Sequence, residues 1–382
     1  MVIAVLCFLY YLTVPNKYHL QLWPFLYLFF AFILYIRIFI KREKEVLNVT
    51  DYSSKQNIII DYICYFYVFC MFVNLLSADY NLASFSLSNV QENAADSYAD
   101  FHAAEAWHSQ TLLERISRNY AVWFLNVAII GAFHWIVRGR EKRGLILLGL
   151  IVIDQGLKSI QIASRGSLFV FVLLLLAVYL IYKDYIPHKT KKTLFQAALV
   201  SGGVLLIYML AITISRFGEM GEGGSDSLFV YFGHSMLTFN YGVADSMNGT
   251  FMGARTFRNF IGLDPEFVFD ADLMLGTHFN TGFITTIGML CLDFGFIGTL
   301  ALGIVLPWVL LKLIKLDNSI GGIFVYVFYL HRMMNGVFVN GSGADAAYFS
   351  MVLVYLILFV SMKLVGKKKK KSKPNIVTYN EA

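Results

Sequence analysis

The chain contains ten apolar stretches of roughly the length that a helix needs to cross a membrane, about 20 residues. They cover residues 1–14, 20–40, 57–77, 119–137, 144–162, 167–182, 194–214, 294–311, 320–339 and 347–365. Only 15% of the 382 residues are charged, whereas a typical soluble domain has about 25%. The sequence therefore predicts an all-α polytopic membrane protein, with about ten transmembrane helices in a single integral membrane domain over 1–382.

Basic residues are distributed unevenly between the segments that join these spans. Twenty-one Lys and Arg residues lie in the segments 41–56, 138–143, 183–193, 312–319 and 363–382. The alternating segments carry six. Since basic residues near span ends favour the cytoplasmic side, we predict that both termini are cytoplasmic, including the basic tail 363–382. The segments 78–118 and 215–280 then become the large external loops.

Motifs and composition exclude several classes of function. The chain has no GxxxxGK[ST] sequence and no GxGxxG after a strand, which disfavours ATP-driven transport. Its net charge of +6 follows from the basic cytoplasmic segments, so no nucleic-acid partner is expected. The four cysteines lie in apolar stretches without CxxC spacing, which predicts neither a disulfide nor a zinc site. The acidic run at 264–272 suits either a site for a hard cation or a solvated loop; we favour the loop, and we expect no metal and no cofactor.

Two segments depart from the simple pattern of spans. Residues 228–247 are apolar but interrupted by polar side chains, which suits a helix that lies in the membrane interface or packs against the bundle. Residues 281–311 are too long for one straight span and too short for two. We predict a short helix or re-entrant segment, a bend permitted by glycine within 293–298, and then the true span. Non-helical backbone at such depth is tolerated only where it lines a cavity.

Ionisable residues inside spans are costly, and they commonly face a cavity or a partner. Asp154 and Lys158 lie four apart on one predicted helix, where they form either an internal ion pair or part of a site. Arg165 lies at the external turn between the fifth and sixth spans. It is either an interfacial arginine at a helix end or a bidentate phosphate ligand. Arg332, in the ninth span, is expected to point inward.

The second external loop adds three arginines and a histidine. Arg255 and Arg258 are three apart, so a helix would place both on one face. Together with Arg216 they form either ordinary surface pairs or the anion-binding floor of an external cavity. His278 lies just before the predicted re-entrant segment. It is a candidate general base or phosphate partner, with a purely structural histidine as the alternative.

Several short motifs resemble those of the Wzy-type polymerases, which join the oligosaccharide repeat units of bacterial O-antigen, capsule and exopolysaccharide. The similar residues are Ser164-Arg165-Gly166 at the start of an apolar span, Tyr231-Phe232, Phe239-Asn240-Tyr241, Gly253 to Phe257, and Thr281 to Gly298. The resemblance covers roughly 160–315, together with the ten-odd spans and the large external loop.

The resemblance implies a lipid-sugar glycosyltransferase on the outer face of the bacterial plasma membrane. It would move a growing glycan from polyprenyl pyrophosphate to the next lipid-linked oligosaccharide, without metal, with a flippase and a chain-length regulator as expected partners. Arginines would stabilise the leaving pyrophosphate, aromatic faces would stack on sugars, and a carboxylate or histidine would take the acceptor proton. The implied substrate-binding residues are Arg165, Arg216, Arg255, Arg258, Arg332 and Tyr241, and the implied catalytic residues are His278 and Asp293.

One family feature is absent, and three alternatives stay open. Some members carry an arginine followed eleven positions later by a glycine in the external loops. No glycine lies eleven positions after Arg216, Arg255 or Arg258, so the resemblance does not fix their individual roles. The alternatives are an O-antigen ligase of the same architecture, a flippase or secondary transporter, and a non-catalytic assembly partner. A transporter is expected to contain internal repeats with paired broken helices, and we find no repeat.

Overall fold

The computed structural model describes residues 21–46, 52–77, 111–161, 165–217, 235–244, 249–254, 256–257, 285–316, 320–336 and 346–366. Over these residues the chain is helical apart from short turns, and no strand occurs. The all-α part of the prediction is therefore confirmed. The elements are α2 (Leu22–Val46), α3 (Ser54–Ser77), α6 (Leu112–Trp123), α7 (Leu125–Val137), α8 (Glu141–Gln161), α9 (Arg165–Tyr182), the 3-10 turn η3 (Lys183–Tyr185), α10 (His188–Phe217), the π-helix η5 (Thr238–Val243), α15 (Thr286–Leu316), α16 (Ile320–Asn335) and α17 (Ala346–Gly366).

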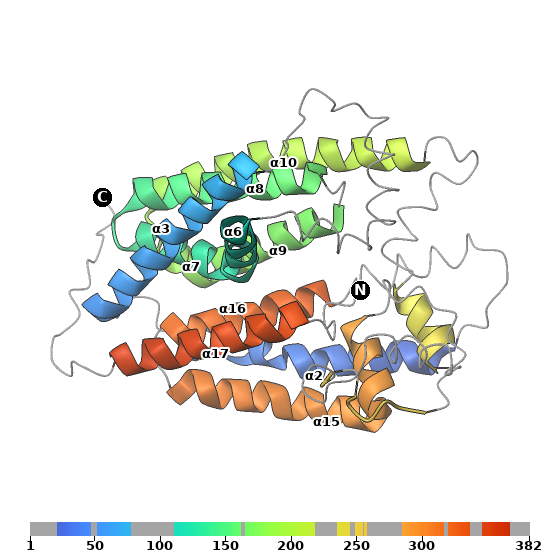
Figure 1. The fold of residues 1–382 in the computed structure, drawn as a ribbon. Coiled ribbons are helices and arrows are strands. Elements are labelled where there is room, and N and C mark those ends of the chain that lie inside the picture. Colours follow the sequence, from blue (N-terminus) through green and yellow to red (C-terminus); the bar gives the residue numbers. More distant parts are fainter. Residues whose placement is uncertain are drawn as a thin grey trace.

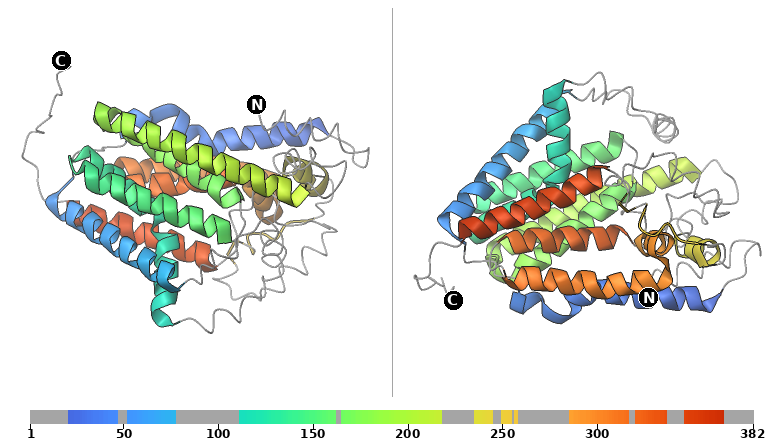
Figure 2. Two further views of the ribbon diagram at one scale, coloured as in Figure 1. Left: turned by 90° about the horizontal axis from the view of Figure 1, so that it is seen from above. Right: turned by 60° about the horizontal axis from the view of Figure 1, so that its bottom comes forward.

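The helices lie in layers, and α16 lies between the two groups of helices that form the cores (Figure 1). It packs against α17, α9, α15, α7 and α2. Helices α2 and α15 run side by side along one edge of the molecule (Figure 2, right). They share one hydrophobic core with η5, whereas α3, α6, α7, α8, α9, α16 and α17 share the other, to which the second part of α15 adds Leu310 and Ile314. The described residues thus bury their apolar side chains in two cores that meet at α15 and α16.

The described helices support membrane insertion but give fewer spans than the ten predicted. Three segments are long and apolar enough to cross a membrane alone, namely Ser54–Leu76, Leu168–Tyr185 and Thr286–Ile314. The bent pair α6 and α7 makes a fourth if it is counted as one span. Three further apolar helices are shorter, over Leu22–Arg37, Ile320–Met334 and Met351–Gly366. The predicted number of ten is therefore not confirmed, and the first predicted span, 1–14, lies outside the described residues.

The predicted span 119–137 is divided into two helices. Helices α6 and α7 meet at Phe124 with a bend of 63°, and the Phe124 ring stacks on Tyr120 with centroids 4.0 Å apart. Helix α6 begins inside the segment that was predicted as an external loop. Its start is fixed by a capping box, in which Glu114 N–H donates to the Thr111 hydroxyl and Thr111 N–H donates to the Glu114 carboxylate at 2.7 Å. These two bonds satisfy amides that the first helical turn leaves without partners.

Several helix ends gather at one end of the molecule, on the left in Figure 1. The Gln56 side chain donates to the Met362 carbonyl at 2.9 Å, which joins the start of α3 to the end of α17. The Thr190 hydroxyl donates to the Glu141 carboxylate, which joins the starts of α8 and α10. We name this the basic end, because it carries the described parts of 138–143, 183–193 and 363–382. Their common location agrees with the predicted topology, while the orientation of this end in a membrane stays a prediction.

The break predicted within 281–311 is present in α15. The helix is regular except at Gly295, whose φ of 71° and ψ of 173° lie outside the helical region. Figure 1 shows the short first part of α15 turning away from the long second part. This backbone conformation is essentially restricted to glycine, because a side chain would clash with the neighbouring peptide groups. A short helix, a glycine bend and a longer helix are therefore confirmed over residues 285–316.

Gly295→Ala should lower the free energy of unfolding by about 1–3 kcal/mol, the strain expected for a residue forced into this region. The added Cβ would also lie 3.3 Å from the Thr250 side chain. The measurement is unfolding of the full chain in detergent. Gly149→Ala in α8 is the matched control, since an added Cβ there meets nothing within 4 Å. Equal stability of the two variants would show that the bend does not need glycine.

Candidate functional site

Asp293 lies two residues before the break in α15 and is almost completely buried. Its carboxylate accepts a hydrogen bond from the Thr256 backbone N–H at 2.8 Å and a second from the Thr256 hydroxyl. A buried carboxylate needs such donors to offset the loss of hydration. The side chain of Asp293 therefore fixes the preceding loop to the helix break.

The loop over 249–257, which we name the docked turn, also bonds to the backbone of α15. Phe251 N–H donates to the Leu292 carbonyl at 3.0 Å, and Gly253 N–H donates to the Asp293 carbonyl at 3.0 Å. These carbonyls come just before the break, where regular helical pairing ends. Gly253 has a φ of 85°, and a Cβ at this position would lie 2.9 Å from the Phe294 ring. The glycine thus permits the close approach, and the break and the docked turn form one unit.

The predicted helix within 228–247 is present in its described part and packs against α2 and α15. Residues 235–244 are helical and include η5. Phe239 is fully buried. The Asn240 side chain donates to the Gln21 carbonyl at 2.6 Å and accepts from Gln21 N–H at 3.1 Å. Of the two predicted placements, packing against the bundle is therefore the one confirmed.

An aromatic cluster lies directly after the break, between α2 and α15. The Tyr27 hydroxyl donates to the Phe296 carbonyl at 2.6 Å. The Phe296 ring lies edge-on to Tyr27 and to Trp23, with centroids 5.1 and 5.3 Å apart. The Phe239 ring stacks on Tyr27 at 5.9 Å. These contacts hold α2, η5 and α15 together around the break.

Arg332 lies on α16 and its side chain faces α17. One guanidinium nitrogen lies 2.9 Å from the Met351 sulfur, and the guanidinium lies 5.6 Å from the centre of the Phe328 ring. Its backbone carbonyl accepts from Gly336 N–H, and Thr286 N–H donates to the Gly336 carbonyl at 2.8 Å. The end of α16 therefore adjoins the start of α15. The backbone of Arg332 thus lies near the start of α15, while its side chain contacts Met351 of α17.

The other predicted site residues fall outside what the structure describes, wholly or in their side chains. Only the backbone is described for Arg165, which opens α9, for Arg216 near the end of α10, and for Tyr241 in η5. Arg255, Arg258 and His278 lie outside the described residues. The structure thus brings Asp293 into contact with Thr256, the residue that follows Arg255 in the chain. Direct contacts of the predicted arginines with one another stay a prediction.

Asp154 and Lys158 form an internal ion pair, which is one of the two interpretations that their spacing of four residues allowed. Lys158 Nζ lies 2.7 Å from Asp154 Oδ2, and the Gln155 side chain donates to the same oxygen at 3.0 Å. Asp154 is fully buried, and its other oxygen has no hydrogen-bond partner among the described residues. The hydroxyl of Tyr67, which interacts electrostatically with Asp154, is likewise buried without such a partner.

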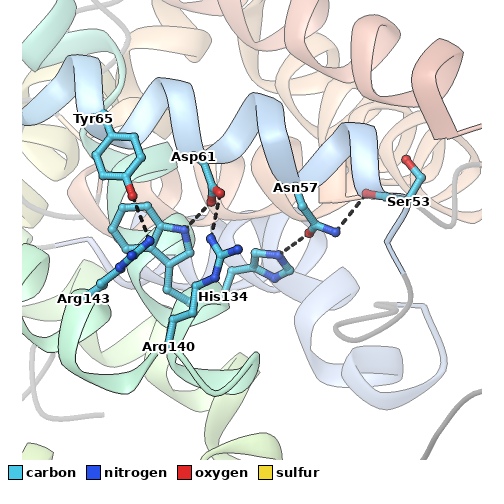
Figure 3. Close-up of polar contacts among 8 residues, drawn as sticks. Ser53, Asn57, Asp61, Tyr65, His134, Arg140 and Arg143 are labelled. Atoms are coloured by element: carbon cyan, nitrogen blue, oxygen red, sulfur yellow. Dashed lines mark hydrogen bonds and ion pairs between the residues drawn. The ribbon is translucent and has the colours of Figure 1, made fainter.

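A polar network at the basic end was not predicted (Figure 3). Asp61 on α3 accepts from Trp135 Nε1 at 2.6 Å and from the Arg140 guanidinium at 2.7 Å. One turn away on α3, Asn57 Oδ1 lies 2.8 Å from His134 Nε2. A signal exists in the sequence, because the polar residues Ser53, Asn57, Asp61 and Tyr65 recur every four positions. That spacing lines one face of a helix.

In the part of the chain that the structure describes, no group of three or more His, Cys, Asp or Glu side chains could hold a metal ion. The acidic run at 264–272 lies outside it. Comparisons of the chain with models of protein families, with curated proteins and with solved structures give no match.

Proposed function

We propose that this chain is an enzyme that polymerises polyprenyl-pyrophosphate-linked oligosaccharide repeat units into a surface polysaccharide. The reaction takes place on the outer face of the bacterial plasma membrane. The observation that carries the proposal is the broken helix α15 with its docked turn. These two segments include the described part of the motif Gly253 to Phe257 and the described part, 285–298, of the motif Thr281 to Gly298, two of the motifs that resemble those of Wzy-type polymerases.

The location of the break supports an external reaction. The break in α15 lies toward the right of Figure 1, whereas the basic end lies at the left. Basic segments favour the cytoplasmic side of a membrane. With the basic end in the cytoplasm, the break and the docked turn lie near the outer face. A lipid-linked oligosaccharide that has been flipped across the membrane is present on that face.

The reaction needs no nucleotide, because the donor is already activated. The acceptor hydroxyl forms a bond to the anomeric carbon of the donor, and the bond from that carbon to the pyrophosphate oxygen breaks with its electron pair leaving on the pyrophosphate. Arginines stabilise the charge that develops there. The acceptor proton passes to His278 or Asp293. Thr256 N–H bonds to Asp293 and Ala254 N–H bonds to the Phe251 carbonyl, so the chain is held on both sides of Arg255.

Deletion of the gene should leave single repeat units on the lipid carrier or on their acceptor, with no long polymer. The measurement is the length distribution of surface glycan and of lipid-linked glycan, with the intact gene restored as the control. Unchanged polymer length would contradict the proposal. Long lipid-linked polymer that is not transferred would identify a ligase. Single units trapped on the cytoplasmic face would identify a flippase.

A further inference from the structure

Two arginines at the basic end are held in place by side chains of α3. The Arg140 guanidinium donates to Asp61 at 2.7 Å, and the Arg143 guanidinium donates to the Tyr65 hydroxyl at 3.1 Å. Asp61 is itself oriented by Trp135, whose ring lies 5.4 Å from that of Tyr65. Figure 3 shows both guanidinium groups aligned along the same side of α3. The two cations are therefore positioned by protein contacts, unlike those of a solvated charge run.

The positive charge of this surface exceeds its negative charge. Segment 138–143 contains four basic residues and one acid, Glu141, and Glu141 accepts from Thr190. Asp61 forms an ion pair with Arg140. Neither Arg138 nor Arg143 forms an ion pair with a carboxylate among the described residues. Burial lowers the pKa of Arg138, and the guanidinium of Arg140 beside it lowers that pKa further, as expected where cations are crowded.

The charged surface continues into an apolar one. Tyr62, Phe66 and Phe69 lie at positions i, i+4 and i+7 of α3, so they share one face. They are 72%, 42% and 48% exposed. On α8, Ile146 follows Arg143 by three residues and is 63% exposed. The contact between Arg143 and Tyr65 joins α8 to α3 between the levels of Tyr62 and Phe66, and the apolar surface extends beyond it to Phe69. An anionic head and an apolar tail that lie end to end would match this arrangement.

We propose that Arg138, Arg140 and Arg143 bind the phosphate of one anionic phospholipid, with its acyl chains along the exposed faces of α3 and α8. A guanidinium has five N–H donors and binds phosphate through two parallel bonds. Among the described residues, Arg140 and Arg143 each donate one side-chain hydrogen bond to the protein, which leaves donors for such a ligand. Basic residues at the cytoplasmic ends of membrane helices attract anionic headgroups. This site is separate from the break in α15, so the proposal does not depend on the enzymatic activity.

The test is native mass spectrometry of the full chain in detergent, titrated with dioleoyl phosphatidylglycerol or with dioleoyl phosphatidylcholine. We expect one phosphatidylglycerol to bind more tightly than any phosphatidylcholine. The double variant Arg138→Gln with Arg143→Gln should bind it about tenfold more weakly or worse. This variant keeps Arg140, so the half-buried carboxylate of Asp61 keeps its cationic partner. The matched control is Lys191→Gln with Lys192→Gln on α10, which removes the same charge at the same end and should leave binding unchanged.

Three results would overturn the proposal. Equal weakening in the α10 control would show general attraction to a positive surface. Equal binding of phosphatidylglycerol and phosphatidylcholine would show that the site does not recognise the net negative charge of the headgroup. Full competition by inorganic phosphate would show a site for a free anion. A further variant, Tyr65→Phe, changes no charge and releases Arg143, so it should weaken binding by a smaller factor, and unchanged binding would argue against positioning by Tyr65. Thermal unfolding of each variant checks that the fold is retained.

Discussion

Arg255→Lys should reduce polymer formation as severely as Arg255→Ala, by about 10²–10³ in rate. Lysine keeps the charge but loses the planar fork that binds a pyrophosphate through two bonds. The size follows from removal of one charge-assisted donor from a partly dry site, about 2.7–4 kcal/mol. We expect the same result at Arg165. The measurement is polymer formed by membranes that contain matched amounts of each variant.

The control for the arginine variants is Arg115→Lys, which changes an exposed arginine of α6 and should have no effect. Full activity of both Arg255→Ala and Arg165→Ala would remove the proposed anion site. Asp293→Asn separates two roles of that residue in the same assay. An asparagine oxygen still accepts from Thr256 N–H, so a variant that retains most activity would identify Asp293 as a positioning residue. A loss as large as in Arg255→Ala would indicate that the reaction uses the carboxylate charge.

Lys158→Met should lower the free energy of unfolding by about 3 kcal/mol. Asp154 is fully buried and pairs with Lys158 at 2.7 Å, so the substitution leaves a buried carboxylate without its cation. Breaking such a pair is strongly destabilising, whereas replacing both members by apolar residues is often neutral. The measurement is unfolding in detergent monitored by circular dichroism.

The double variant Asp154→Leu with Lys158→Met provides the control. It removes both charges, and its stability should return to within about 1 kcal/mol of the parent chain. A stability loss in the double variant as large as in Lys158→Met would mean that side-chain packing, and not the unpaired charge, causes the effect. Lys191→Met removes a lysine of α10 at a site without a buried partner. It should leave the free energy of unfolding unchanged.

The elements predicted best are those that depend on local sequence. Spans were predicted at 144–162 and 167–182, and α8 ends at Gln161 while α9 begins at Arg165. The break in α15 was predicted because a long apolar run with glycines near its middle has few alternatives, and Gly295 adopts the conformation that only glycine tolerates. The pair of Asp154 and Lys158 follows from helical spacing alone.

Features that depend on partners from distant segments were not predicted. At the bend between α6 and α7 the Phe124 ring packs on Tyr120, whose hydroxyl donates to the Ile63 carbonyl of α3 at 3.3 Å, and hydropathy over a span does not detect such a contact between helices. The bonds of Asp61 to Trp135 and Arg140 join residues more than seventy positions apart. In the candidate site, the sequence identified Asp293 but not its bond to Thr256, because nothing local indicates that the docked turn returns to α15.

The two carbonyls before the break and the carboxylate of Asp293 receive their hydrogen bonds from one short turn. In apolar surroundings each backbone group left without a partner costs several kcal/mol. Movement of the docked turn away from α15 would expose the carbonyls of Leu292 and Asp293 together with a buried charge. We therefore expect the docked turn to stay on α15 rather than to open as a lid. Entry and release of a substrate bound at the break would then depend on the movement of other segments.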